Sequence, residues 1–237
     1  MSNSHLSKQF DNDLEALRSQ VLQMGGLVEA QVRGAIQAFS NGNISLADQI
    51  VETELRVDRF EIDIDSDCSQ IIVRRQPAAA DLRLIMAVTK TVTDLERIGD
   101  EAHKIARMAK QIHERGVADL SRFANLRHTA DAAVNMLRQS LDAFARLDVK
   151  VAEQIILEDR VIDLEFKAVV RQLITFMMED PRIISTALDI IWIAKAIERI
   201  GDHAKNICEY VIYIVHGTDV RHAKSGASEA ENTLAKA

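Results

Sequence analysis

The sequence predicts an all-α protein made of two tandem, similar three-helix bundles, with six long helices in total. Of its 237 residues, 47% are hydrophobic, which is enough for a sizeable core. Only 9 glycines and 2 prolines punctuate the chain, whereas β-sandwiches, barrels and alternating β/α folds need many more turns. The second half of the chain also repeats the pattern of the first, which predicts a pseudo-twofold internal repeat.

The first three helices follow from apolar spacing and from helix-breaking residues. Apolar residues recur at helical spacing over residues 10–40, and the Asn-Gly-Asn sequence at 41–43 is expected to end that helix. A second helix is expected over residues 45–75. Pro77 suits the first turn of a third helix, because its missing N–H would be unpaired there anyway. Gly116 is expected to stop this helix.

The last three helices show the same signals. A fourth helix is expected over residues 120–146, and Asp148 suits the N-cap of a fifth. Asp180 and Pro181 repeat the signal of a cap followed by proline, which predicts a sixth helix that ends near Gly217. The small, polar residues that follow predict disorder. The predicted units are a first bundle (residues 1–116), a second bundle (residues 117–217) and a flexible polar tail (residues 218–237).

The internal repeat is visible directly in the letters. At a shift of 105 residues Ala38-Phe39 falls on Ala143-Phe144. Further along, the sequence Glu-Arg-Ile-Gly-Asp at 96–100 recurs letter for letter at 198–202. Chance could match one dipeptide but not an ordered series of this kind, so helices one to three and four to six are predicted to be two copies of one unit.

Acidic residues interrupt the apolar seams of two helices. On the second helix, residues taken alternately four and three apart lie on one face, and this stripe is apolar at its ends and acidic at its centre. The equivalent stripe on the fifth helix contains one pair of acids among apolar residues. Like charges on one helix face repel, and inside a seam they are costly unless a cation neutralises them. A solvated acidic face is the alternative interpretation. The acids are Glu54, Asp58, Glu61 and Asp65 on the second helix, and Asp159 and Asp163 on the fifth.

Matching acid pairs on the third and sixth helices are expected at the same height. Asp58 and Glu96 each lie 19 residues from Pro77. If the prolines mark turns between antiparallel helices, four carboxylates converge in each bundle, about 30 Å from the turn. Ligand sets made only of oxygen favour hard cations. The predicted metal ligands are Glu54, Asp58, Glu96 and Asp100 in the first bundle, and Asp159, Asp163, Glu198 and Asp202 in the second.

Other residues are weaker candidates. His103 and Asn206 are expected to support the two sites from outside rather than to bind metal. Gly99 and Gly201 are costly inside helices, so a close approach of the helix backbones beside the acids is expected there. Trp192 is expected in the core, with an interface anchor as the alternative. The methionines expected as core filler are Met24, Met86, Met108, Met136, Met177 and Met178.

Charge and hydropathy exclude several classes of protein. The formal net charge of −7 is the wrong sign for a non-specific nucleic-acid binder. No apolar run approaches the roughly 20 residues that span a bilayer, and the beginning shows no secretory signal. Cys68 and Cys208 are too few and too far apart for a disulfide scaffold. We therefore expect a soluble, intracellular protein that reaches a membrane only through partners.

The repeated Glu-Arg-Ile-Gly-Asp motifs stand in a sequence that resembles the PhoU family of phosphate-transport regulators, and the resemblance covers nearly the whole chain. The motifs that carry it are MGGLVE (24–29), RRQPAAADLRLI (74–85), DLERIGDEAHKIA (94–106), MMEDPRII (177–184), AIERIGDHAKNI (196–207) and YVIYIVHGTDVRH (210–222).

This resemblance implies multinuclear metal clusters on the bundle surfaces, held by the eight acidic residues named above, with Fe, Mn, Mg or Zn as the expected ions. It also implies a cytoplasmic negative regulator of the phosphate-starvation response. Such a regulator connects the ATPase subunit of a phosphate ABC transporter to a phosphate-sensing membrane histidine kinase, and a homodimer is favoured. Because Glu61 and Asp65 correspond to Phe166 and Val170, the two sites are not expected to hold the same number of ions.

A carboxylate-bridged di-metal enzyme is the alternative function. Helical bundles of that kind place a Glu-x-x-His motif on two helices, and neither repeat contains one. The sequence also lacks a recognisable Ser-His-Asp or Cys-His arrangement and a Gly-rich phosphate loop. We therefore predict a non-catalytic adaptor, with a purely structural helical spacer as a third possibility.

Overall fold

The structure is a computed structural model that describes residues 8–116 and 124–220. These residues form six long helices and one short 3-10 helix and contain no strand, which confirms the all-α prediction. The predicted start of the fourth helix near residue 120, and the tail beyond residue 220, lie outside the described residues. The elements are α1 (Lys8–Asn41), α2 (Ile44–Arg75), α3 (Ala79–Glu114), α4 (Ala124–Arg146), α5 (Val149–Glu179), η2 (Pro181–Ile183) and α6 (Ile184–His216).

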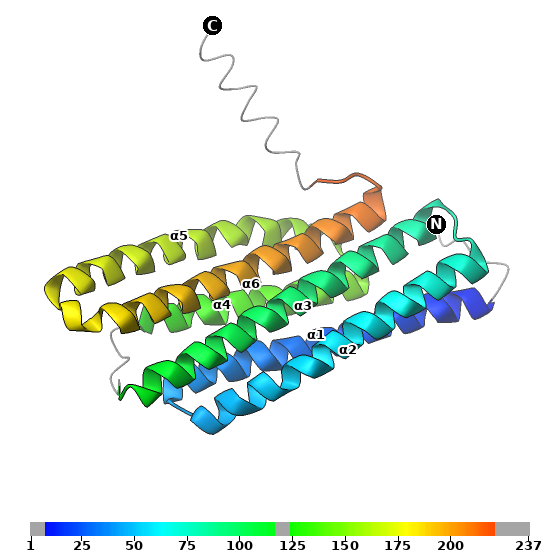
Figure 1. Ribbon diagram of the computed structural model, residues 1–237. Helices are drawn as coiled ribbons and strands as arrows, with labels where there is room; N and C mark the ends of the chain where they lie inside the picture. The colour runs from blue at the N-terminus through cyan, green and yellow to red at the C-terminus, as the bar shows by residue number, and fades with distance from the viewer. Residues whose placement is uncertain (1–7, 117–123, 221–237) are drawn as a thin grey trace, which may run out of the picture.

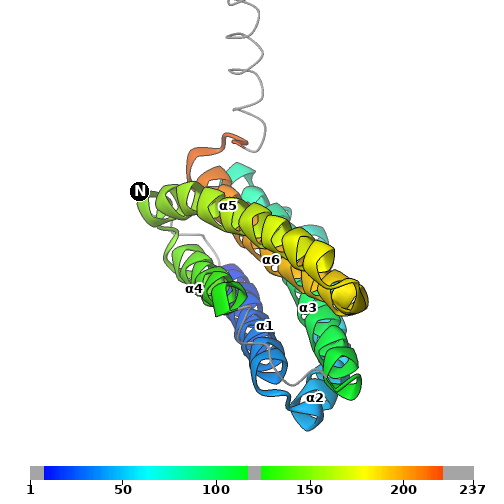
Figure 2. The same ribbon diagram turned by 90° about the vertical axis from the view of Figure 1, so that its left-hand side faces the viewer.

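The six helices form two three-helix bundles that lie side by side (Figure 1). Helices α1, α2 and α3 make the first bundle, and α4, α5 and α6 make the second. Helix α3 packs along α6, and α1 packs against α4, whereas α2 and α5 lie at the outside (Figure 2). The buried apolar side chains of the described residues form one connected core through both bundles. The outer helices α2 and α5 therefore each form one seam with the central helix of their own bundle.

Local signals at the helix ends mostly agree with the structure. The Asp148 side chain accepts a hydrogen bond from Val151 N at 3.1 Å, which confirms the predicted N-cap of α5. Gly217 ends α6 with a φ of 73°, a conformation that glycine adopts without strain. The prediction for Pro77 was wrong, because α3 begins at Ala79 and Pro77 lies in the connection before it. Gln76 ends α2 in the left-handed conformation with a φ of 49°, so the proline belongs to the turn itself.

Gly99 and Gly201 lie where the helices of each seam approach one another, as predicted. A Cβ atom at Gly201 would lie 3.1 Å from Ile162 Cδ1 on α5. A Cβ atom at Gly99 would lie 3.4 Å from Val57 Cγ1 on α2, which is an ordinary contact. Val57 and Ile162 occupy equivalent positions of the repeat, so both bundles pack the same pair of helices through the same glycine, more tightly in the second.

Three residues expected in the core lie at the surface. Trp192 is 59% exposed, Met86 is 43% exposed and Met178 is 81% exposed, so the core prediction was wrong for them. Met24 and Met136 are buried as expected. The α5–α6 hairpin extends past α4 (Figure 1), so Met178 at the end of α5 has fewer helices against which to pack. Trp192 lies between the buried Ile190 and Ile193 on α6, and its own side chain is on the solvent-exposed side of the helix. Among the described residues no helix is long and apolar enough to cross a membrane.

Alanine substitutions at the two glycines test this difference in packing. Alanine favours a helix over glycine by about 1 kcal/mol, so we expect Gly99→Ala to leave the melting temperature unchanged or to raise it. Gly201→Ala adds a methyl group that Ile162 must accommodate, so this variant is expected to melt below Gly99→Ala. Calorimetry of the two metal-free variants measures the difference. Equal stabilisation by both substitutions would contradict the tighter approach at Gly201.

Candidate metal centres

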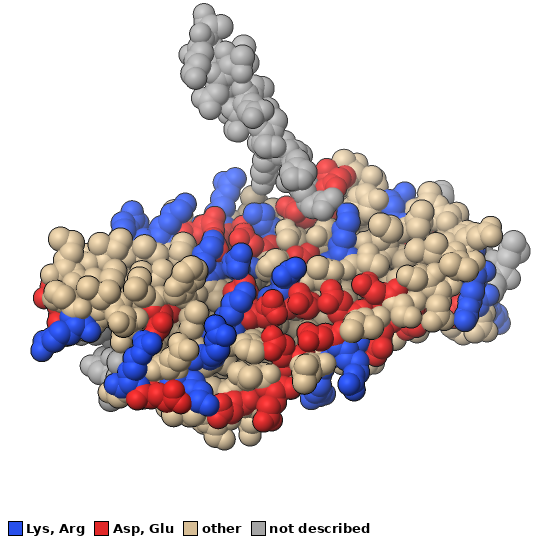
Figure 3. Space-filling model, viewed as in Figure 1, with Lys and Arg blue, Asp and Glu red and all other residues tan. Residues whose placement is uncertain are grey.

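The first acidic seam lies between α2 and α3, where acidic side chains form a band across the face shown in Figure 3. We define the first seam as Asp58 and Glu61 of α2 with Glu96 and Asp100 of α3. Burial raises the pKa of Glu96, and the charges of Asp100, Glu61 and Asp58 raise it further. Burial also raises the pKa of Glu61, with the neighbouring charges of Asp65 and Asp58 adding to the effect. These carboxylates therefore lie close enough to repel one another.

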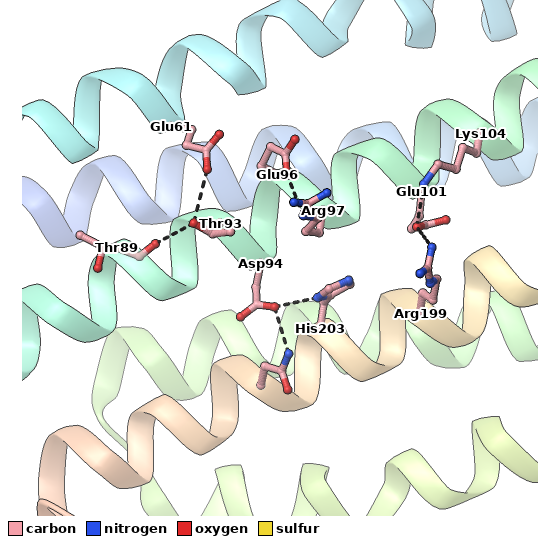
Figure 4. Close-up of polar contacts among 11 residues, drawn as sticks. Glu61, Thr89, Thr93, Asp94, Glu96, Arg97, Glu101, Lys104, Arg199 and His203 are labelled. Atoms are coloured by element: carbon pink, nitrogen blue, oxygen red, sulfur yellow. Dashed lines mark hydrogen bonds and ion pairs between the residues drawn. The ribbon is translucent and has the colours of Figure 1, made fainter. Parts of the chain in front are cut away.

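Glu54, predicted as a ligand of the first bundle, has a different neighbour. Its carboxylate lies against His103 Nδ1 of α3. Glu61 lies among the other three acids instead, and its Oε1 accepts a hydrogen bond from Thr93 Oγ1 at 3.4 Å (Figure 4). The first bundle thus brings Asp58, Glu96 and Asp100 together with Glu61, while Glu54 pairs with His103. Asp65 lies in an exposed position further along the stripe.

The second acidic seam lies between α5 and α6. We define it as Asp159 and Asp163 of α5 with Glu198 and Asp202 of α6, the four ligands predicted for this bundle. Burial raises the pKa of Asp202 to about 6, and the charges of Glu198, Asp159 and Asp163 contribute. Asp159 is only 3% exposed. The other three predicted residues of the second bundle therefore all lie close enough to act on Asp202.

Two lysines contact the second seam. Lys205 Nζ donates a hydrogen bond to Asp159 Oδ2 at 2.7 Å. Burial opposes the charged form of this amine, but the hydrogen bond and charge of Asp159 raise the pKa of Lys205 overall. Lys195 Nζ donates to Glu198 Oε1 at 2.7 Å. The second seam is therefore partly neutralised by cations of its own chain.

The donor chemistry of both seams fits a hard metal ion. Each seam offers four carboxylates, and oxygen ligands of this kind suit Mg²⁺, Mn²⁺ and iron. The Lys205 ammonium already stands beside Asp159 where a cation would be favourable. Within residues 8–116 and 124–220, however, no three acidic, imidazole or thiol side chains already surround one point as metal ligands do. An ion at either seam would have to draw the carboxylates together from their present orientations.

The two cysteines do not supply thiolate ligands for a metal ion. Cys68 and Cys208 are both buried and free. Burial raises the pKa of the Cys68 thiol to about 12 and raises that of Cys208 as well. Both thiols therefore stay protonated at neutral pH, and a thiol must lose its proton to become a strong metal ligand.

The face of α3 that is turned toward α6 carries a polar network that sequence reasoning missed (Figure 4). Asp94 is 6% exposed, and its Oδ1 lies 2.7 Å from His203 Nδ1 and accepts a hydrogen bond from Asn206 Nδ2 at 3.0 Å. Asn206, expected beside the second seam, thus faces the other bundle. Glu101 is 5% exposed and pairs with Lys104 of its own helix and with Arg199 of α6, at 2.9 and 3.0 Å.

A break in the internal repeat was the available signal for this network. Asp94 corresponds to Ala196, and Glu101 corresponds to His203, so the polar residues stand where the two copies differ. Buried carboxylates need partners, because an unpaired buried charge is strongly destabilising. The two bundles therefore interact through specific polar pairs in addition to apolar packing.

Tandem three-helix bundles with an acidic seam in each define this chain as an all-α repeat protein with two related carboxylate sites. A family model for the PhoU domain matches it twice, over residues 21–109 and again over residues 126–211. The two matches coincide with the two bundles. The chain belongs to the PhoU family.

Curated relatives and solved structures agree with this assignment. The chain is 51% identical to a phosphate-specific transport system accessory protein PhoU homolog of Pseudomonas putida, over 92% of this chain and 85% of the relative. It is 45% identical to the phosphate-specific transport system accessory protein PhoU of Escherichia coli K12, over 98% of this chain and 95% of the relative. These relatives are accessory proteins, which confirms the prediction of a protein that is not an enzyme.

The crystal structure of PhoU from Pseudomonas aeruginosa superposes with a TM-score of 0.85 at 48% identity, and covers 88% of this chain and 100% of that chain. The phosphate transport system regulatory protein PhoU from Streptococcus pneumoniae superposes with a TM-score of 0.82 at 26% identity, over 89% of this chain and 99% of that chain. The prediction of tandem bundles is therefore confirmed by both the family model and the solved structures.

Proposed function

We propose that this chain is a metal-binding adaptor that negatively regulates phosphate uptake and the phosphate-starvation regulon. The observation that carries the proposal is its similarity, through both repeats, to a phosphate-specific transport system accessory protein of Escherichia coli. The proposed partners are the ATPase subunit of the phosphate ABC transporter and the phosphate-sensing membrane histidine kinase. The proposed location is the cytoplasm, at the inner face of the membrane through these partners, and the proposed assembly is a homodimer.

Surface chemistry supports a role in protein contacts. The net charge of −7 favours partners with basic patches, and such contacts weaken with salt. Ile184, Leu188 and Trp192 follow one another at intervals of four residues on α6 and are exposed by 42%, 47% and 59%. Exposed apolar surface of this kind is typical of interaction sites. The two bundles offer two related faces, which suits an adaptor with two partners.

The metal part of the proposal rests on the two seams. A bound cation would offset the repulsion among the carboxylates and would hold α2 against α3 and α5 against α6. The ions we propose are Fe, Mn, Mg or Zn. In the first bundle the side chains that would hold them are Asp58, Glu61, Glu96 and Asp100, together with Glu54, which now pairs with His103. In the second bundle they are Asp159, Asp163, Glu198 and Asp202.

Alanine variants test the assignment of metal to the seams. We expect Glu96→Ala/Asp100→Ala to lose manganese from the first bundle and to keep it in the second, because half of one carboxylate set is removed. Elemental analysis after dialysis against Mn²⁺ counts the bound ions. The matched variant Glu198→Ala/Asp202→Ala should show the reverse. Unchanged metal content in both variants would contradict the assignment of metal to the two seams.

A pull-down tests the adaptor role. We expect the purified chain to retain the transporter ATPase subunit and the cytoplasmic region of the kinase at low salt, and to release them as the salt concentration rises. Deletion of the gene is expected to leave phosphate-starvation genes expressed in phosphate-rich medium. Retention of neither partner, with or without metal, would contradict the proposal.

A further inference from the structure

The two acidic seams differ at three equivalent positions that all bear on charge. On the outer helix, an acid of the first seam is replaced by an aromatic residue in the second. On the central helix, a hydroxyl and an imidazole of the first bundle are each replaced by lysine. The equivalent pairs, in the order first bundle and second bundle, are Glu61 and Phe166, Thr93 and Lys195, and His103 and Lys205.

The replacements at Glu61/Phe166 and Thr93/Lys195 involve side chains that contact each other in both bundles. In the first seam, Thr93 donates a hydrogen bond to the carboxylate of Glu61. In the second, Lys195 lies over the ring of Phe166 with its Nζ 5.4 Å from the ring centroid, and it also donates to Glu198. A cation over an aromatic ring is favourable. The exchange therefore removes one negative charge from the seam and adds one positive charge.

Lys205 supplies a second positive charge. Its Nζ lies 2.7 Å from Asp159, whose side chain is 5% exposed, so this ion pair is largely shielded from water. Charged hydrogen bonds in such surroundings are stronger than at the surface. The equivalent His103 lies against Glu54, which is the equivalent of Asp159, so the first bundle places an imidazole where the second places an ammonium.

No lysine pairs with the first seam within the residues that the structure describes. The one cation paired with it there is Arg97, which lies 3.5 Å from Glu96 and whose side chain is 59% exposed. Solvent screens a pair of this kind, so it contributes little. Within the described residues the first seam is therefore left without a shielded cation, whereas the second seam has two cations of its own.

We propose that Lys195 and Lys205 are built-in counter-ions that make the second seam a weaker, exchangeable metal site, while the first seam retains its metal. This inference rests on the proposed metal binding at the seams. An ion that enters the second seam has to displace Lys205 from Asp159 and Lys195 from Glu198. A groove of about 700 Å³ beside Asp159, Asp163 and Lys205 gives the displaced Lys205 side chain room to move. The chain would then bind metal at two different concentration thresholds.

Manganese titrations of two isolated seams test the proposal. Glu96→Ala/Asp100→Ala leaves the second seam intact, and Glu198→Ala/Asp202→Ala leaves the first. The electron paramagnetic resonance signal of free Mn²⁺ reports binding in each variant. We expect the second seam to bind Mn²⁺ about tenfold more weakly than the first, which corresponds to a difference of about 1.4 kcal/mol in binding free energy.

Removal of each lysine should then tighten the weak site. In the Glu96→Ala/Asp100→Ala background, Lys205→Met and Lys195→Met are each expected to strengthen Mn²⁺ binding severalfold. The matched control is Lys110→Met, because Lys110 pairs with Asp48 at 2.7 Å on the surface of α3, in an ion pair outside both seams. This control is expected to leave Mn²⁺ binding unchanged. Circular dichroism melting of each variant checks that it is folded.

Exchange of residues between the repeats gives a second, independent comparison. Phe166→Glu/Lys195→Thr gives the second seam the residues of the first and is expected to strengthen its Mn²⁺ binding. Glu61→Phe/Thr93→Lys, tested on the isolated first seam, is expected to weaken binding there. Equal affinities of the two seams, or lysine variants that bind like the Lys110→Met control, would overturn the lysine proposal and leave metal binding itself intact. Absence of Mn²⁺ binding in the unmodified protein would instead overturn the proposed metal function and this inference with it.

Discussion

Repulsion among carboxylates held on facing helices is the constraint on which this structure depends. The acids cannot separate, because the same helices are fixed by apolar packing on either side of them, with Val57 against Gly99 and Ile162 against Gly201. Burial raises the pKa values of Glu96 and Asp202, and the charges of the neighbouring carboxylates raise them further. A bound cation, a cation of the chain itself or a proton taken up by a carboxylate can each relieve this repulsion, and the second bundle already carries cations of its own.

The central helices α3 and α6 connect this constraint to the rest of the molecule. Glu96 and Asp100 face α2, whereas Asp94 and Glu101 of the same turns pair with α6 across the junction of the bundles. On α6, Asp202 belongs to the second seam and the adjacent His203 lies beside Asp94. A change in the packing of either seam therefore acts on the helices that join the two bundles. An adaptor with a docking face on each bundle could use this connection to make one contact sensitive to the other.

Much of the fold and part of the candidate site could be predicted from the sequence. The repeat and the acid pairs in apolar stripes led to the correct helices and to the second seam, because helical spacing and distance from the turns set the height of each residue. The pairing of Glu54 with His103 could not be foreseen, since it depends on the rotation of α2 against α3. The Asp94 network left only a break in the internal repeat as its signal, and the partners of Asp94 depend on how the two bundles pack together. Trp192 was placed wrongly because apolar residues surround it on α6, and the sequence does not show that Ile190 and Ile193 face the core while Trp192 faces solvent.

The melting temperature of the metal-free protein, with and without Mn²⁺ and at pH 7.5 and pH 5.5, tests the central claim most directly. An acid whose pKa is raised by folding, such as Asp202 at about 6 against 3.8, takes up a proton in the folded state before it does so in the unfolded chain. The metal-free protein should therefore become more stable as the pH falls from 7.5 to 5.5, and Mn²⁺ should stabilise it at pH 7.5. Both gains should shrink in Glu198→Gln/Asp202→Asn. Melting that is insensitive to Mn²⁺ and that does not rise on acidification would contradict the account.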